Sequence, residues 1–356
     1  MHSTIRTGII GFGMAGKVFH APFISTLPGF RLSKISTSRE AAAREARALY
    51  PDTEIVSDAG SVLKDSAIDL VIICTPNAEH LPLAQAALRQ GKHVIVEKPF
   101  TVTSADADTL IALARQQQRI LTVHHNRRWV ADYKTVKKVI AGGLLGKLAT
   151  YEAHYDRFRP TLRPQAWREE SVPGAGILYD LGAHLIDQAL QLFGLPQEIT
   201  ADVQIQRPGG KADDYFDLTL RYPALRASLH AGMLVRKPGP FFSLHGDRGS
   251  FVKYGMDVQE EALKAGRTPA DTPDWGAEPE HLWGQIFTEF EGLPFSGAVQ
   301  SERGSFQDFF INVQQAIRGE AELIVAPEQA RDVIRIIELA LQSAREKRTV
   351  RCPAEI

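Results

Sequence analysis

The sequence predicts an α/β protein with two domains, the first built on a doubly wound parallel sheet and the second an α+β domain on a largely antiparallel sheet. Two observations indicate this class: apolar runs alternate with helical segments in the first third, and strand-like runs follow one another in the second half. A chain of 356 residues also exceeds one comfortable hydrophobic core. We therefore expect a boundary between residues 1–123 and 124–356.

The first domain is predicted from strand-like runs separated by alanine-rich segments with helical spacing of apolar residues. The expected strands are Thr7–Ile10, Leu32–Thr37, Glu54–Val56, Leu70–Cys74, His93–Val96 and Ile120–Val123. The expected crossover helices include Arg39–Tyr50, His80–Gln90 and Ala105–Gln118. Regular alternation of this kind is typical of a parallel sheet with helices on both faces.

The second domain has a different order of secondary-structure elements, in which short strands dominate. The expected helices are Trp129–Ala141, Ile177–Phe193 and Pro327–Arg348. The expected strands are Leu148–Phe158, Ile199–Arg207, Phe216–Tyr222, Arg226–Leu234, Phe242–His245 and Ser250–Tyr254, and Gly266–Pro279 is expected to be a loop. Short turns between consecutive strands favour antiparallel pairing.

The composition excludes several classes of partner. A net charge of −1 creates no field that would attract nucleic acid or anionic lipid. The sequence has no signal-like start and no apolar run of membrane-spanning length, so we expect a cytoplasmic protein. Cys74 and Cys352 lack metal-binding spacing, and neither a disulfide nor a metal site is expected.

A glycine motif, Gly11-Phe12-Gly13-Met14-Ala15-Gly16, directly follows the first expected strand and opens a helical segment. In this context GxGxxG indicates a Rossmann domain that binds a dinucleotide. The first glycine permits the turn, the second lets the backbone approach the pyrophosphate, and the third allows close packing of helix and strand. All six residues are therefore predicted to bind the cofactor.

The end of the second expected strand, Ser36-Thr37-Ser38-Arg39, suggests NADP rather than NAD, although NAD is not excluded. NAD-specific folds place an acid near this position to bind the ribose 2′-hydroxyl, but the first acid here is Glu40. Ser38 and Arg39 instead offer donors suited to a 2′-phosphate. The alternative is that Ser38 only caps the following helix and Arg39 is solvated.

Two further motifs follow strands that should border the nicotinamide. The fourth run ends in Thr75-Pro76-Asn77, with His80 on the next helix, and Asn77 either contacts cofactor or caps that helix. The fifth run ends in Glu97-Lys98-Pro99, which places a carboxylate and an ammonium in the same crevice. The alternative for Lys98 is a surface ion pair with Glu97.

The segment from Gly174 to Asp187 contains the residues best suited to proton transfer. Helical spacing places Asp180, His184 and Asp187 on one stripe. Histidine titrates near working pH and suits the removal of a hydroxyl proton, while an ammonium favours the developing alkoxide. We expect His184 to be the base, Lys98 to stabilise the alkoxide or relay the proton, Asp180 to orient the substrate, and Asp187 to be structural. The alternative for His184 is a structural role in the core.

With these motifs the chain resembles the glucose–fructose oxidoreductase and inositol dehydrogenase family of NAD(P)-dependent enzymes over essentially its whole length. The resemblance implies that Lys98, Asp180 and His184 form the catalytic group. Within the family the sequence is most similar to NADP-dependent scyllo-inositol dehydrogenases, through His125–Trp129, Arg157–Pro160, Trp167-Arg168 and Tyr179–Gly182. Gly174-Ala175-Gly176 departs from the three glycines of many relatives, which bears on the shape of the pocket.

Several polar and aromatic residues are candidates for binding a sugar-like substrate, because arginine supplies fixed donors and aromatic rings cover apolar faces. They are Arg127, Tyr155, Arg157, Arg163, Trp167 and Arg168. The alternative is that the arginines form structural pairs with Asp156, Glu169 or Glu170.

The expected activity is hydride transfer between nicotinamide and a secondary alcohol or ketone of a cyclic polyol or sugar, with scyllo-inositol as one candidate. The alternatives are another sugar, a dihydrodiol, or a cofactor-binding regulator without turnover. A metal-dependent lyase or hydrolase is disfavoured, because no HExxH-type spacing occurs. We also expect a homodimer or homotetramer joined through the C-terminal sheets.

Overall fold

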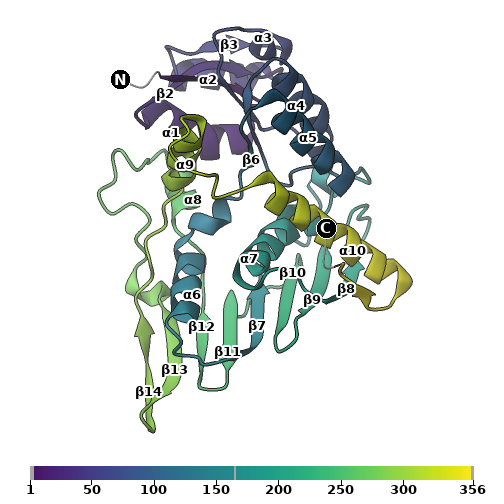
Figure 1. The fold of residues 1–356 in the computed structure, drawn as a ribbon, viewed down its shortest axis with the longest axis vertical. Helices are drawn as coiled ribbons and strands as arrows, with labels where there is room; N and C mark the ends of the chain where they lie inside the picture. Colours follow the sequence, from purple (N-terminus) through teal and green to yellow (C-terminus); the bar gives the residue numbers. More distant parts are fainter. Residues whose placement is uncertain (1–3, 164–165, 354–356) are drawn as a thin grey trace. The chain divides into compact units, whose positions relative to one another are not determined.

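The computed structural model describes residues 4–163 and 166–353, which form two compact units, each drawn from three stretches of chain (Figure 1). Unit 1 comprises residues 1–126, 259–275 and 305–331, and unit 2 comprises residues 127–258, 276–304 and 332–356. The chain first passes from unit 1 to unit 2 after residue 126, close to the expected domain boundary after residue 123. Two later segments of the chain return to unit 1.

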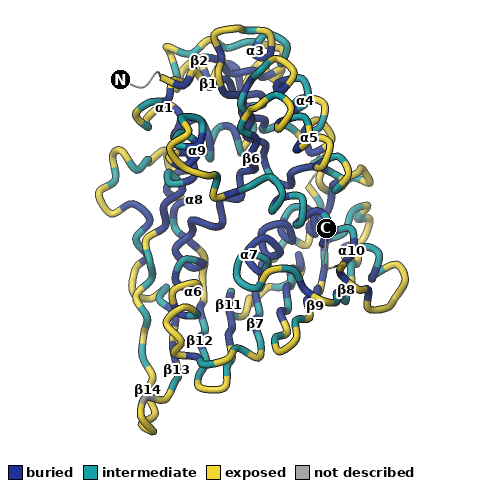
Figure 2. The backbone as a smooth tube through the Cα atoms, viewed as in Figure 1, coloured by how far each residue is buried: buried dark blue, intermediate teal, exposed yellow. Residues whose placement is uncertain are grey.

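Unit 1 contains a six-stranded sheet in the order β3-β2-β1-β4-β5-β6, and all its strands are parallel. The strands are β1 (Ile5–Ile10), β2 (Phe30–Ser36), β3 (Glu54–Val56), β4 (Leu70–Ile73), β5 (His93–Val96) and β6 (Leu121–Val123). This is the predicted doubly wound sheet. Every residue of β4 is buried, and Figure 2 shows the same for most of the sheet's centre. A sheet covered on both faces has this continuous apolar character.

The helices of unit 1 include the predicted crossover helices and three helices that were not predicted. The helical elements of this unit are η1 (Ala15–His20, a π-helix), α1 (Ala21–Thr26), α2 (Glu40–Leu49), α3 (Gly60–Leu63), η2 (Asn77–Glu79), α4 (His80–Arg89), α5 (Ser104–Gln117), α8 (Gln259–Lys264) and α9 (Gln307–Ile317). The three that were not predicted are α3, α8 and α9. α4 packs against α5, and α1 packs against α9 (Figure 1). Phe310 of α9 stacks on Phe23 of α1, so the late segment completes the core.

Unit 2 is built on a nine-stranded sheet in the order β14-β13-β12-β11-β7-β10-β9-β8-β15, and among the described residues only its β7–β10 pair is parallel. The strands are β7 (Leu148–His154), β8 (Glu198–Gln204), β9 (Tyr215–Arg221), β10 (Arg226–Gly232), β11 (Phe242–Gly246), β12 (Gly249–Lys253), β13 (Gly284–Phe290), β14 (Leu293–Val299) and β15 (Val350–Arg351). The predicted largely antiparallel sheet is confirmed. The hairpin of β13 and β14 was not predicted.

The helical elements of unit 2 are α6 (Ala131–Ala141), η4 (Trp167–Glu169), η5 (Leu178–Gly182, a π-helix), α7 (Ala183–Phe193) and η6 (Glu280–Leu282). Among them, η5 and α7 pack against β10. Two elements cross between the units, η3 (Asn126–Trp129) and α10 (Pro327–Glu346). On β7, Tyr151 is buried and packs its ring against Phe193 of α7, while the next residue, Glu152, belongs to the opposite face. Among the helices described, none is long and apolar enough to cross a bilayer.

Candidate active site

The glycine turn after β1 has the geometry of a dinucleotide site. Gly11 has a φ of +95°, and a Cβ there would lie 2.6 Å from the Cys74 carbonyl oxygen. A Cβ on Gly16 would lie 2.2 Å from the Gly11 carbonyl oxygen. Both glycines are therefore required by the chain itself.

Gly13 is different, because the nearest atom to a Cβ at this position is Arg39 Nη2, at 3.8 Å. Its backbone conformation and surroundings leave room for a side chain. A glycine that the fold does not need fits a position where a ligand must approach the backbone. The turn is therefore suited to a pyrophosphate, as its sequence indicates.

Arg39 lies beside this turn. Its Nη2 donates a hydrogen bond to the Phe12 carbonyl oxygen over 3.1 Å, which directs the guanidinium toward the glycine motif. The alternative in which Ser38 only caps the next helix is wrong: Arg39 is the N-cap of α2, and no side chain makes a capping hydrogen bond there. Ser38 is exposed at the end of β2. Both residues thus remain available to a ligand at this edge.

The residues after β4 serve more structural purposes than the sequence suggested. Asn77 begins η2 with Pro76 as its N-cap, while Glu79 is the N-cap of α4, so Asn77 does not cap that helix. His80 is fully buried, with Nδ1 2.9 Å from the Pro99 carbonyl oxygen and Nε2 3.1 Å from that of Thr75. This ring joins the loops that follow β4 and β5.

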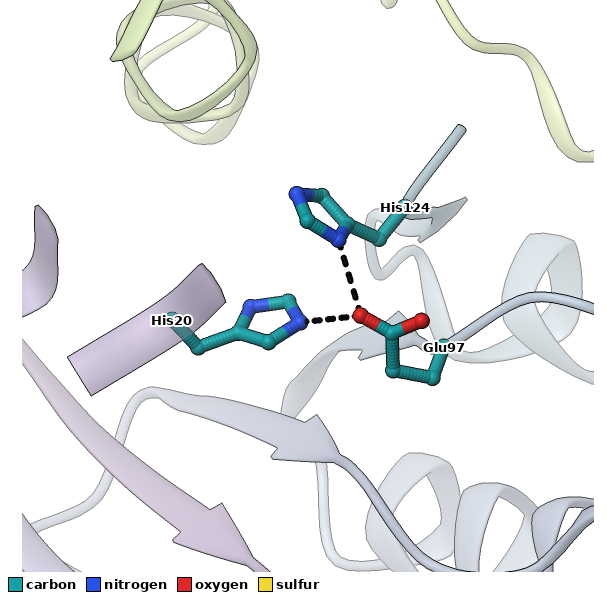
Figure 3. Close-up of side chains that lie close together, drawn as sticks. All are labelled: His20, Glu97 and His124. Atoms are coloured by element: carbon teal, nitrogen blue, oxygen red, sulfur yellow. Dashed lines mark hydrogen bonds and ion pairs between the residues drawn. The ribbon is translucent and has the colours of Figure 1, made fainter. Parts of the chain in front are cut away.

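Glu97 forms a buried cluster with two histidines, shown in Figure 3. Its Oε1 lies 2.6 Å from His20 Nε2 and 2.8 Å from His124 Nδ1. Its Oε2 accepts a hydrogen bond from the backbone N–H of Lys98 over 3.1 Å. Burial opposes ionisation, but the charges and hydrogen bonds of His124 and His20 outweigh it and hold the pKa of Glu97 well below its usual range. A surface pair of Glu97 with Lys98 is thus the wrong description of this carboxylate, which instead fixes the backbone at Lys98.

In unit 2, a π-helix changes the expected stripe of polar residues. η5 contains Asp180, and α7 begins directly after it with Ala183. Because a π-helix winds with more residues per turn, the α-helical spacing between Asp180 and His184 does not hold. Asp187 keeps its α-helical spacing from His184 within α7, and it forms a buried ion pair with Arg128. Its predicted structural role is confirmed.

His184 is 7% exposed, and its ring stacks on Tyr155 with the centroids 6.3 Å apart. Two guanidinium groups also make cation–π contacts with the Tyr155 ring: that of Arg157 lies 5.1 Å and that of Arg127 lies 5.7 Å from the ring centroid. The structure therefore brings Arg127 and Arg157 to the Tyr155 ring, which stacks on His184.

A cavity of about 120 Å³ lies in unit 2 beside Asp180. Its lining includes four of the residues predicted to bind substrate, namely Arg157, Arg163, Trp167 and Arg168. It also includes residues that sequence reasoning missed, among them Arg159, Arg207, Asp213 and Met233. Arg159 follows Arg157 by two residues in an extended run, so the two side chains share a face. This alternation could have predicted that Arg159 lines the same cavity as Arg157.

Among the described residues, the alternative in which these arginines pair with Asp156, Glu169 or Glu170 is met only in part. Arg168 Nε lies 3.3 Å from Asp180 Oδ1, so it pairs with a predicted catalytic residue. Asp156 contacts histidines, and Glu170 pairs with Lys211. Glu169 accepts a hydrogen bond from the backbone N–H of Arg163 and lies 3.5 Å from Arg207.

The conformations of Gly174, Ala175 and Gly176, which precede η5, explain why alanine can replace the middle one of the three glycines found in many relatives. A Cβ on Gly176, whose φ is +85°, would lie 1.9 Å from Asp213 Oδ1. That carboxylate accepts a hydrogen bond from the Leu178 N–H at the start of η5, and burial raises its pKa to about 6. Gly174 also has a positive φ, whereas Ala175 does not, so glycine is not needed at position 175.

Comparisons with known proteins cover both units. The family described as an oxidoreductase family with an NAD-binding Rossmann fold matches residues 5–125, and its C-terminal alpha/beta domain matches residues 137–352. A scyllo-inositol 2-dehydrogenase (NADP(+)) of Bacillus subtilis is 42% identical over 98% of this chain and 96% of its own length. The oxidoreductase YdgJ of Escherichia coli is 44% identical over 98% of this chain and 99% of its own.

Solved structures agree with this relationship. The oxidoreductase YvaA of Bacillus subtilis has a TM-score of 0.94 at 41% identity and covers 99% of both chains. The oxidoreductase YPO2259 of Yersinia pestis has a TM-score of 0.93 at 40% identity and covers 100% of this chain and 99% of its own.

Proposed function

Because the chain belongs to the oxidoreductase family with an NAD-binding Rossmann fold and a C-terminal alpha/beta domain, we propose that it is an NADP-dependent dehydrogenase of cyclic polyols, with scyllo-inositol as its first candidate substrate. Its reaction class is hydride transfer between a nicotinamide and the CH–OH group of a cyclic polyol or sugar. The single observation that carries the proposal is the 42% identity, over nearly the whole chain, to a dehydrogenase of that substrate and cofactor.

The proposed catalytic residues are Lys98, Asp180 and His184. The bound nicotinamide supplies the acceptor for the hydride that leaves the substrate carbon. A ring nitrogen of His184 takes the hydroxyl proton, so that the alcohol becomes a ketone. The Lys98 ammonium stabilises the oxygen while it carries negative charge. Asp180, paired with Arg168 beside the cavity, orients the substrate hydroxyls.

The remaining predicted site residues divide by unit. In unit 1 the glycine turn holds the pyrophosphate, Ser38 and Arg39 bind the 2′-phosphate, and the loops after β4 and β5, with Thr75, Pro76, Asn77 and Lys98, border the nicotinamide. In unit 2 the substrate lies against Arg157, Arg163, Trp167 and Arg168. These assignments rest on the open space at Gly13 and on the cavity beside Asp180.

The test is an activity panel of inositols, aldoses and sugar acids with each nicotinamide cofactor, followed by absorbance at 340 nm. We expect oxidation of a cyclic polyol with NADP. Lys98→Ala and His184→Ala should each lower turnover by about 10²–10⁴-fold while NADPH affinity stays within about tenfold. A matched control is Lys211→Ala, an exposed lysine paired with Glu170.

Two outcomes would contradict the proposal. Near-normal turnover in both folded variants would remove Lys98 and His184 from the chemistry. Tight NADPH binding without turnover of any polyol or sugar would instead favour a cofactor-binding regulator.

We also propose a homo-oligomer joined through the sheet of unit 2. The hairpin of β13 and β14 exposes three large apolar side chains, Phe287, Leu293 and Phe295. Exposed apolar side chains grouped on one hairpin are typical of a surface that another chain covers. Light scattering at micromolar concentration should give a multiple of 39.3 kDa, and a monomer mass would refute this assignment.

A further inference from the structure

Two histidines and an aspartate meet on the face of the unit 2 sheet opposite Tyr155. Asp156 follows the end of β7, and its Oδ1 lies 2.8 Å from Nδ1 of His230 on β10. Its Oδ2 lies 3.5 Å from Nδ1 of His154, the last residue of β7. Because alternate residues of a strand point to opposite faces, His154 and Asp156 share a face that Tyr155 does not.

We propose that His154, Asp156 and His230 form a binding site for a divalent transition-metal ion of the zinc class. The three ligand atoms lie within 4.8 Å of one another. In a tetrahedral zinc site with ligand bonds of about 2.0–2.1 Å, neighbouring ligand atoms are about 3.3 Å apart, so small rotations of the two rings close this cluster on an ion. Two imidazoles and one carboxylate are a ligand set that such ions prefer, with water in the remaining positions.

The charge around the cluster also favours a cation. Besides Asp156, a second carboxylate, that of Glu152, belongs to the residue two positions before His154 on the same face of β7. Asp217 is the β9 residue directly opposite His230 in the antiparallel ladder. Three carboxylates therefore surround two imidazoles, and a divalent ion would balance this negative charge.

In a single chain the site is partly exposed to solvent, whereas the cluster of Glu97 is enclosed. The Asp156 side chain is only 6% exposed, but those of His154 and His230 are 33% and 18% exposed. The ring of Tyr215 stands edge-on against His230 with centroids 5.2 Å apart and holds that imidazole in place. In contrast, both histidines of the Glu97 cluster are enclosed, and His20 is fully buried among Phe310 and His124.

The proposed ion clamps β7 to β10, the only parallel pair in the described part of the sheet. It lies on the face away from Tyr155, whose ring stacks on His184, so it stabilises the sheet and takes no part in hydride transfer. The inference does not depend on the proposed function. It predicts metal-dependent stability in a protein whose turnover needs no added metal.

The test uses untagged full-length protein stripped with a chelator. Equilibrium dialysis against Zn²⁺ with elemental analysis should give one ion per chain at micromolar affinity or tighter, and Zn²⁺ should raise the melting temperature. Co²⁺ should give the visible absorption of a four- or five-coordinate ion. Asp156→Asn and His230→Ala should weaken binding at least about tenfold, with folding checked by circular dichroism.

His245→Ala is the matched control, because His245 is an exposed histidine on β11 whose Nδ1 contacts the Ser250 hydroxyl. It should bind Zn²⁺ like the parent. Failure of the parent to bind one equivalent, equal binding by Asp156→Asn, or loss of the ion in His124→Gln instead would each overturn the assignment.

Discussion

Asp187 of α7 accepts two hydrogen bonds from Arg128, one from Nε to Oδ2 over 2.9 Å and one from Nη2 to Oδ1 over 2.6 Å. Both side chains are almost fully buried. Removing one partner of such a pair leaves a buried charge without its counter-ion, so Asp187→Ala should lower the free energy of unfolding by about 3–5 kcal/mol in urea titrations. The double variant Arg128→Met with Asp187→Leu should recover most of this loss. A single-variant cost below about 1 kcal/mol would contradict a tightly coupled pair.

The two glycines of the cofactor turn should respond differently to alanine. Gly16→Ala should lower the melting temperature, because its Cβ would collide with the Gly11 carbonyl oxygen. Gly13→Ala should leave the melting temperature unchanged but weaken NADPH binding at least about tenfold, because its methyl group occupies space meant for the pyrophosphate. Fluorescence titration with NADPH and thermal unfolding measure the two effects. Unchanged NADPH affinity in Gly13→Ala would remove the pyrophosphate from this turn.

The cofactor preference should depend on Arg39. A charge-assisted hydrogen bond contributes about 1.5–3 kcal/mol, so Arg39→Ala should shrink the NADP-over-NAD ratio of kcat/KM by about tenfold or more. Arg44→Ala is the matched control, since Arg44 is an exposed arginine of α2 that pairs with Glu40. Equal or NAD-favouring values in the parent enzyme would refute the assignment of Arg39.

The stability of the protein should fall as the pH decreases from 6.5 toward 4, in part through His93. Burial, aided by the positive charge of Arg119, lowers the pKa of His93 to about 4, and its Nδ1 accepts a hydrogen bond from the Ile120 N–H over 3.0 Å. The unfolded chain therefore binds a proton near pH 6.5 that the folded chain resists, so stability is full above this pH and is lost on acidification.

His93→Asn keeps an acceptor but removes the titration. Between pH 7 and pH 5 its loss of unfolding free energy should be smaller than that of the parent by about 1 kcal/mol, after allowance for partial exposure. Urea midpoints at both pH values measure this difference. An identical pH dependence in the two proteins would show that His93 does not contribute.

The sequence was most informative where one physical signal dominated. β3 and β5 match their predicted bounds. β5 is a mostly buried run rich in β-branched residues, which has few alternatives, whereas β3 matches although its residues are only half-buried or exposed. The hairpin of β13 and β14 was missed because its large apolar side chains Phe287, Leu293 and Phe295 are exposed, which weakens the alternation of apolar and polar residues. Its signal was Glu291-Gly292, a two-residue turn in which both residues have positive φ.

Other features of the structure could not be predicted from any pattern in the sequence. A π-helix has the same composition as an α-helix, so the altered spacing at Asp180 could not be read from the sequence. The cluster of His154, Asp156 and His230 depends on a strand pairing across 74 residues. The cluster of Glu97 likewise needs His20 to fold back from the first helical segment.

The three-part construction of unit 1 has a consequence for synthesis on the ribosome. Phe306 packs its ring edge-on against Phe19, and the Thr122 hydroxyl donates to the Val325 carbonyl oxygen, so residues near both ends of the chain complete one core. A nascent chain of 126 residues carries all six strands of the sheet but lacks these partners. The nucleotide-binding unit therefore finishes folding only after residue 331 has left the exit tunnel, and until then its unfinished apolar surface is open to chaperones.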